Sequence, residues 1–257
     1  MLPSTEELTA EILVASQHEA PTKELLEVYR TGTMYFANGE RVLLDQTSLG
    51  LTEGRILWHL ARSLRPNLII ETGFGRGGSA AFLLAAVDPW GGRVISIDPA
   101  FRLWAQDAGP RYLERLGVAS RHKLIEKPSE FALAELASNP ALERLKASYI
   151  DGSHHFDGTL IDFMYLDRLT EVGGIIAIDD AHAPAVRTVA SFVAHNLPYN
   201  LHYATQRLVL CTKTAELERE WCHFKPFQSS RNPDWNVHFG RPDPESVPGA
   251  TFGDACP

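Results

Sequence analysis

Short apolar runs alternate with amphipathic helical segments between residues 67 and 213. The strand-length runs are NLIIETG, RVISIDP, HKLIEKP, ASYIDG and GGIIAIDD, and a segment with apolar residues at helical spacing lies between each run and the next. This alternation predicts right-handed βαβ units around a buried parallel sheet. Two last runs, LHYAT and RLVLCTK, predict an antiparallel edge hairpin. The expected fold is a doubly wound, Rossmann-like α/β fold with a seven-stranded, mostly parallel sheet.

The flanks of this core have a different pattern. Residues 4–29 predict two amphipathic helices interrupted at Pro21, which could cover a site or form a dimer face. The next helical segment opens near Thr52, the expected N-cap, and ends at Pro66. Beyond Lys213 the chain becomes rich in Pro, Asn, Asp and Gly, with scattered aromatic residues. We therefore expect a helical cap (1–47), a catalytic domain (48–213) and a C-terminal arm (214–257).

Composition narrows the classes of partner. The chain has 257 residues, 44% of them hydrophobic, and a net charge of −8, so it lacks the broad basic face that nucleic acid requires. The N-terminus has no signal-peptide pattern, and no apolar stretch predicts a membrane span. Three widely spaced cysteines, Cys211, Cys222 and Cys256, predict free thiols in a reducing cytoplasm. The flanking segments favour a homo-oligomer, with a dimer as the first expectation.

A glycine-rich loop follows the first strand of the core. The segment from Glu71 to Ser79 reads ETGFGRGGS and opens a helix, where glycines let the backbone approach a ligand. Its G-x-G-x-x-G spacing is shared by dinucleotide sites, and a purely structural turn is a further alternative. Glu71 favours a cofactor with a cationic amine over a pyrophosphate. Asp98, at the end of the next strand, is suited to bind both ribose hydroxyls.

These segments together resemble class I S-adenosylmethionine-dependent methyltransferases. The resemblance rests on ETGFGRGGS, VISIDP, ASYIDGSHHFDG and LTEVGGIIAIDD, and spans about residues 48–213. Within that superfamily the pattern is similar to small-molecule O-methyltransferases of antibiotic pathways and of the catechol type. It implies that Glu71 and the loop backbone hold the methionine portion, Asp98 the ribose, and Ser129 the adenine. The implied cofactor-binding residues are Glu71, Gly73, Phe74, Gly75, Gly77, Ser79, Asp98, Ser129 and Asp151.

Acidic side chains end the fourth and fifth predicted strands. Asp151 follows one strand, and Asp179 and Asp180 follow the next, so a parallel sheet would bring them together. Oxygen-only ligands suit Mg²⁺, and metal-dependent O-methyltransferases carry Asp, Asp and Asn there, with Asp180 replacing the amide in this chain. Alternatively, the carboxylates form a proton-accepting site without metal. In a third interpretation Asp179 caps a turn and Asp151 only touches cofactor or substrate.

Histidines lie beside these acids. His154 comes three residues after Asp151, where the catechol-type family carries its catalytic lysine. Imidazole accepts a proton near neutral pH, so the resemblance implies that His154 is the general base. His182 is a second candidate, as a base or as an additional ligand.

The preferred function is methyl transfer from S-adenosylmethionine to a small-molecule acceptor, at a hydroxyl oxygen and with help from a divalent metal. An NAD(P)-dependent oxidoreductase is an alternative, which Glu71 and the lack of a Tyr-x-x-x-Lys pair beside a strand end disfavour. A non-catalytic S-adenosylmethionine-binding protein is the third possibility, because fold and cofactor do not guarantee chemistry.

Overall fold

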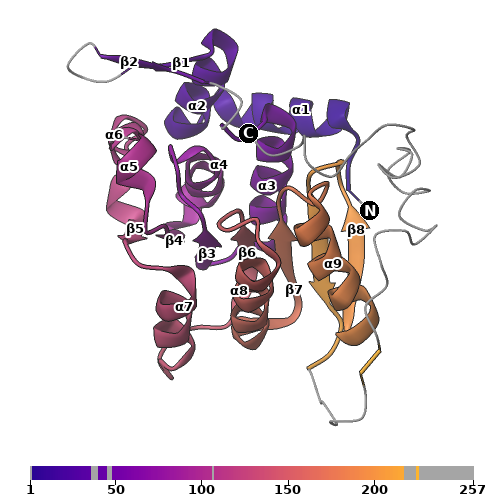
Figure 1. Ribbon diagram of the computed structural model, residues 1–257. Coiled ribbons are helices and arrows are strands. Elements are labelled where there is room, and N and C mark those ends of the chain that lie inside the picture. The colour runs from indigo at the N-terminus through magenta and orange to yellow at the C-terminus, as the bar shows by residue number, and fades with distance from the viewer. Residues whose placement is uncertain (1, 36–39, 45–47, 106, 217–223, 226–257) are drawn as a thin grey trace, which may run out of the picture.

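The predicted sheet is present. The computed structural model describes residues 2–35, 40–44, 48–105, 107–216 and 224–225 (Figure 1). Its seven-stranded sheet has the order β5-β4-β3-β6-β7-β9-β8. Strands β3 to β7 are parallel, whereas β9 is antiparallel to both β7 and β8. The strands are β3 (Leu68–Thr72), β4 (Arg93–Ile97), β5 (His122–Ile125), β6 (Leu145–Ile150), β7 (Thr170–Ile178), β8 (Tyr199–Tyr203) and β9 (Val209–Lys213).

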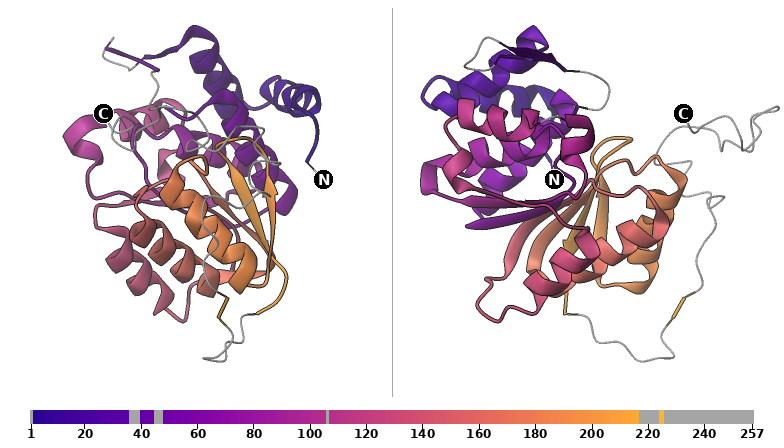
Figure 2. Two further views of the ribbon diagram at one scale, coloured as in Figure 1. Left: turned by 45° about the vertical axis from the view of Figure 1, so that its right-hand side comes forward. Right: turned by 60° about the vertical axis from the view of Figure 1, so that its left-hand side comes forward.

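Helices cover both faces of the sheet, as the right panel of Figure 2 shows. Side chains alternate between the two faces along each strand. Ile69 therefore joins the core beneath α3 and α4, while Leu68 and Ile70 join the core beneath α7, α8 and α9. The core helices are α3 (Leu51–Leu64), α4 (Gly78–Val87), α5 (Phe101–Ala105), α6 (Ala108–Arg115), α7 (Ser129–Ala137), α8 (Phe156–Leu169) and α9 (Pro184–Asn196), with short 3₁₀ turns at Asp88–Trp90 and Ala119–Arg121.

Two N-terminal helices, α1 (Thr5–Ser16) and α2 (Ala20–Thr31), pack against α3 and α4. Ser4 and Glu7 form a capping box at the start of α1. Proline fits the first turn of α2 because no intrahelical partner is needed for its missing N–H. Tyr29 then connects this segment to the core: its hydroxyl donates to the carbonyl of Leu49 at 2.9 Å. The segment consequently lies beside the glycine loop.

Two local features differ from the sequence expectation. Helix α3 begins at Leu51 with Gly50 as its N-cap, so the prediction of Thr52 as the cap is wrong. Glu53 takes the favourable acidic position in the first turn of this helix. A small antiparallel hairpin of β1 (Thr33–Tyr35) and β2 (Arg41–Leu43) was not predicted, since three-residue strands leave no periodicity to recognise.

The predicted boundaries at residues 47 and 213 stay predictions. Nearly all of the expected C-terminal arm, including Cys222 and Cys256, lies outside the described residues. Cys211, in β9, is a buried free thiol. Within the described part of the chain, every helix is too short or too polar to cross a membrane.

Candidate active site

A cavity of about 610 Å³ opens where the parallel strands end, which is within the size range of small-molecule sites. The glycine loop and the ends of β4, β6 and β7 form its floor, and the N-terminal segment forms one wall. Ten residues that the sequence assigned to the site line it: Gly73, Phe74, Gly75, Ser79, Asp98, Ser129, Asp151, His154, Asp179 and Asp180.

Backbone hydrogen bonds align the strand ends that carry these side chains. Gly73 donates to the carbonyl of Ile97, Asp151 to that of Thr72, and Asp179 to that of Ile150, all between 2.8 and 2.9 Å. The ladder thus continues past the last residue of each strand. Acidic side chains as far apart in sequence as Asp98 and Asp179 therefore meet at one edge of the sheet.

The first position of the loop must be glycine, because its backbone lies against the backbone of Asp151. Gly73 has a φ of 84°, and a Cβ there would lie 1.9 Å from the carbonyl oxygen of Asp151. Gly75 and Gly77 also have positive φ values, 51° and 76°. Only glycine adopts such values without cost, so the sequence ETGFGRGG folds into a loop that exposes its backbone to the cavity.

Asp98 holds this loop in shape. Its Oδ2 atom accepts hydrogen bonds from the backbone N–H of Phe74 at 3.0 Å and of Gly75 at 2.9 Å. Its Oδ1 atom accepts from the N–H of Ala100 at 2.8 Å. Asp98 lines the cavity while remaining mostly buried. The carboxylate can therefore organise the loop and still face a ligand.

Glu71 lies beneath the cavity and is fully buried. Ser96 donates to its Oε1 atom at 2.5 Å, and the same hydroxyl lies 2.7 Å from Nε2 of His122. The Oε2 atom has no hydrogen-bond partner among the described residues. Burial raises the pKa of Glu71 to about 8, although hydrogen bonds from Ser96 and Ser79 act in the opposite direction. Glu71 does not itself line the cavity.

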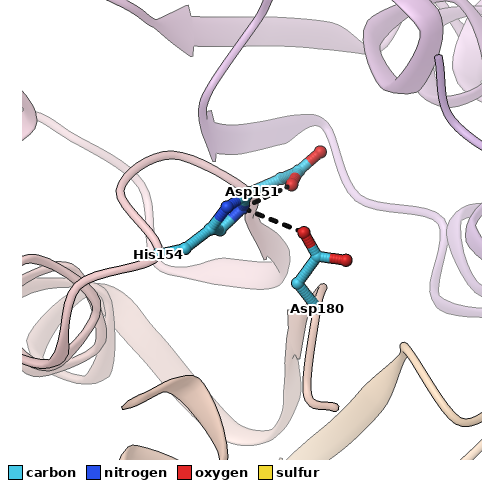
Figure 3. A group of neighbouring side chains, drawn as sticks. All are labelled: Asp151, His154 and Asp180. Atoms are coloured by element: carbon cyan, nitrogen blue, oxygen red, sulfur yellow. Dashed lines mark hydrogen bonds and ion pairs between the residues drawn. The ribbon is translucent and has the colours of Figure 1, made fainter. Parts of the chain in front are cut away.

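Three acids form what we call the carboxylate cluster: Asp151, Asp179 and Asp180. His154 points between two of them, with Nε2 at 3.4 Å from Oδ1 of Asp151 and 3.3 Å from Oδ2 of Asp180 (Figure 3). One donor atom from each of Asp151, His154 and Asp180 lies within 4.8 Å of the other two. Asp180 has a φ of 50°, a left-handed conformation that aspartate tolerates better than most residues. This backbone turn directs its carboxylate toward His154.

Interactions within the carboxylate cluster shift the pKa values of His154 and Asp179. The hydrogen bond to Asp151 raises the pKa of His154, and the nearby carboxylates of Asp180 and Asp179 raise it further. Burial raises the pKa of Asp179 to about 7, and the charge of Asp151 adds to this effect. Paired perturbations of this kind concentrate at functional sites.

Sequence reasoning did not identify Arg207, which completes the cluster. Its Nη2 atom lies 2.7 Å from Oδ1 of Asp180 and 3.6 Å from Oδ2 of Asp179. The register explains its position: Val209 pairs with Ile178 in the antiparallel β9–β7 ladder, so the residues before Val209 meet those after Ile178. The predicted edge hairpin would have revealed this neighbour if its register had been known.

The remaining predicted residues lie around the edge of the cavity. Nδ1 of His182 is 3.6 Å from Oδ1 of Asp180, but His182 is half exposed and does not line the cavity, and nor does Gly77. Ser129 begins α7 and lines the cavity. Behind it lies Asp162, a buried acid that sequence reasoning missed; burial raises its pKa to about 6, and the hydroxyls of Ser129 and Thr72 oppose the shift.

Residues 70–181, which include the glycine loop, Asp98 and the carboxylate cluster, match the family model described as a methyltransferase domain. The chain contains a methyltransferase domain. No curated protein sequence matches this methyltransferase.

Solved methyltransferases share its fold. An O-methyltransferase from Bacillus cereus in complex with SAH is 17% identical, with a TM-score of 0.58 over 82% of this chain and 100% of that one. TomG from Streptomyces achromogenes, an O-methyltransferase solved with SAM, is 18% identical, with a TM-score of 0.56 over 83% and 100%. SAH-bound PaMTH1 from Podospora anserina is 18% identical, with a TM-score of 0.57 over 84% and 99%. These structures confirm the predicted fold, and the family model over residues 70–181 supports the prediction of a methyltransferase. The roles of single site residues stay predictions.

Proposed function

We propose that this methyltransferase transfers a methyl group from S-adenosylmethionine to a hydroxyl oxygen of a small-molecule acceptor. We further propose that a divalent cation binds at the carboxylate cluster, with Mg²⁺ as the first candidate. One observation carries the proposal: a single cavity is bordered by the glycine loop, Asp98, His154 and the cluster. The structural neighbours that contain SAM or SAH support the choice of cofactor.

The residues fit this cofactor. The buried Oε2 atom of Glu71 lacks a partner among the described residues and would be stabilised by a cationic ammonium group. Asp98 faces the cavity at the end of β4, where it would accept from ribose hydroxyls. Gly73 and Gly75 leave room for the ligand beside their backbone, and Ser129 would border the adenine. When bound, S-adenosylmethionine supplies an electrophilic methyl group on a sulfonium.

The cluster fits a divalent cation. Asp151 and Asp180 would hold the ion through carboxylate oxygens, the ligand type that Mg²⁺ prefers. His154 lies within the same group of donor atoms, and Asp179 is the remaining oxygen candidate. When bound, the ion would act as a Lewis acid that lowers the pKa of the acceptor hydroxyl. The donor set supports Asp151 and Asp180 as the proposed ligands, with Asp179 as a proposed third.

The chain's own residues supply proton transfer and positioning. His154 would accept the proton of the acceptor hydroxyl at Nε2, the atom that faces the cluster. The freed oxygen forms a bond to the methyl carbon as the carbon–sulfur bond breaks, and the thioether keeps that electron pair. Asp151 and Asp180 orient the imidazole while it receives the proton.

Calorimetric titration tests the cofactor and the metal separately. We expect chelator-treated protein to bind S-adenosylmethionine with a Kd on the order of micromolar, about −8 kcal/mol. Mg²⁺ should give a separate heat, and NAD⁺, the control for the shared glycine spacing, should give none. Binding of NAD⁺ without binding of S-adenosylmethionine would contradict the proposal. A panel of hydroxyl-bearing acceptors then distinguishes an enzyme from a protein that only binds the cofactor.

We also propose a cytoplasmic homodimer that acts on neither nucleic acid nor a membrane surface. The net charge of −8 supports the exclusion of nucleic acid. The apolar side chains of Leu13 and Val14 on α1, 51% and 59% exposed, support an interface at that helix. Light scattering of the purified protein would determine the oligomeric state.

Cofactor binding is expected to release a proton from Glu71. Its pKa of about 8 means that the carboxyl is mostly protonated at pH 7 without cofactor. A cationic amine favours the charged form, so binding should lower this pKa and release close to one proton at pH 7, roughly 0.9 by mass action. Calorimetry in two buffers of different ionisation enthalpy measures the release. Glu71→Gln should abolish it, and equal release by both proteins would exclude Glu71 as its source.

A further inference from the structure

Arg207 brings a permanent positive charge to the residues proposed to hold a cation. Its guanidinium forms ion pairs with Asp180 at 2.7 Å and with Asp179 at 3.6 Å. Asp179 is 3% exposed, so part of this charge interaction lies away from bulk solvent, where it is weakly screened. Arginine remains charged at every pH at which the protein is folded. The carboxylate cluster therefore already has a counter-ion of its own.

The backbone that carries Arg207 is fixed, although its side chain is 43% exposed. The carbonyl of Arg207 accepts from the N–H of Ala181 at 2.7 Å, which ties it to the residue after Asp180. Thr205 accepts from the N–H of Arg207 at 3.1 Å and donates to Glu53 of α3 at 3.0 Å. Displacement of the guanidinium from the cluster therefore needs only rotation of the side chain, with no movement of the hairpin.

We propose that Arg207 is an internal competitor for the metal: its guanidinium neutralises Asp179 and Asp180, and a divalent cation binds only by displacing it. This inference rests on the proposed metal site and adds that one residue sets the affinity of that site. Arg207 pairs with Oδ1 of Asp180, whose other oxygen faces His154, so a divalent cation on the same carboxylate would lie close to the guanidinium and be repelled by it. The competition keeps the buried acids paired before the ion arrives, and weakens the binding of the ion once it does.

The test uses Mn²⁺ as the probe, because the electron paramagnetic resonance signal of the free aqueous ion reports binding without any assay of activity. We expect Arg207→Gln to bind Mn²⁺ about tenfold more tightly than the unsubstituted protein, since a half-exposed ion pair is removed. Arg207→Lys keeps a charge at this position and should bind more weakly than Arg207→Gln. The rise in thermal midpoint on adding Mn²⁺ should be largest for Arg207→Gln.

Arg93→Gln is the matched control, because it removes the same charge at the amino end of β4, away from the cavity. Its affinity for Mn²⁺ should equal that of the unsubstituted protein. If Arg207→Gln binds Mn²⁺ no more tightly than the unsubstituted protein, the competition is refuted while the metal site stands. If neither protein binds Mn²⁺, both the metal site and the competition are refuted. Equal tightening by Arg93→Gln would reduce the effect to net charge and overturn the proposal.

Discussion

Replacing His154 by glutamine is expected to lower turnover of the acceptor by about 100-fold or more, the usual effect of losing a general base. Glutamine has a similar size and keeps a polar group near Asp151 and Asp180, but it cannot take up a proton. The loss should fall on kcat, with the affinity for S-adenosylmethionine unchanged. Steady-state kinetics with calorimetry on the same preparations would measure both.

The same role for His154 predicts how turnover depends on pH. A base works in its neutral form, and the carboxylates raise the pKa of His154 above the ordinary histidine value. Turnover of the unsubstituted protein should therefore rise as pH increases through that raised pKa and then reach a plateau. A bound divalent cation adds positive charge beside the imidazole, so Mg²⁺ should move the inflection to lower pH. In His154→Gln this inflection should disappear, and rising pH should restore part of the activity.

Two neighbouring histidines serve as controls. His182 is 3.6 Å from Asp180 but does not line the cavity, and His155 contacts Ser153 at 3.1 Å, so their glutamine variants should lose little turnover. If saturating Mg²⁺ restored His154→Gln fully, the residue would be a metal ligand instead of the base. Unchanged turnover would leave Asp179, whose pKa is about 7, as the proton acceptor.

Asp98→Ala is expected to weaken binding of S-adenosylmethionine by about 100-fold or more, with or without metal. The substitution removes the predicted ribose contacts and leaves the N–H groups of Phe74 and Gly75 without their acceptor. Each hydrogen bond to a charged group contributes roughly 1.5–3 kcal/mol, and about 1.4 kcal/mol is a factor of ten in affinity. Calorimetry measures the affinity, and the thermal midpoint without ligand reports the separate loss of loop stability.

Asp179→Ala provides the contrast for Asp98→Ala. Asp179 follows β7 and belongs to the carboxylate cluster, so its loss should abolish stimulation of turnover by Mg²⁺ and leave cofactor affinity nearly intact. The two acids lie at the same edge of the sheet and line the same cavity. An equal loss of cofactor affinity in both variants would contradict the division of the cavity into a cofactor part and a metal part.

Much of this protein could be predicted from the chain alone, because local pattern and backbone geometry act over short distances. Alternating apolar runs predicted the parallel strands, and the glycine-rich segment after the first of them predicted a loop whose backbone approaches a ligand. The structure adds that Gly73, Gly75 and Gly77 have positive φ. Acids placed after neighbouring strands predicted the convergence of Asp151, Asp179 and Asp180, since parallel strands end at one edge. Boundaries that depend on a single cap, such as Thr52, failed because Gly50 takes that position.

Long-range packing decided the rest. Whether Glu71 is exposed to the cavity or buried beneath it depends on the side chains around it, and burial is what raises its pKa to about 8. Arg207 reaches Asp180 because β9 pairs with β7 in one particular register, which places the turn before Val209 beside the residues after Ile178. The sequence by itself therefore determined which chemical groups meet at the end of the sheet, through strand order and loop chemistry. Their charge balance was decided by the tertiary structure, since burial and register are properties of the packed chain.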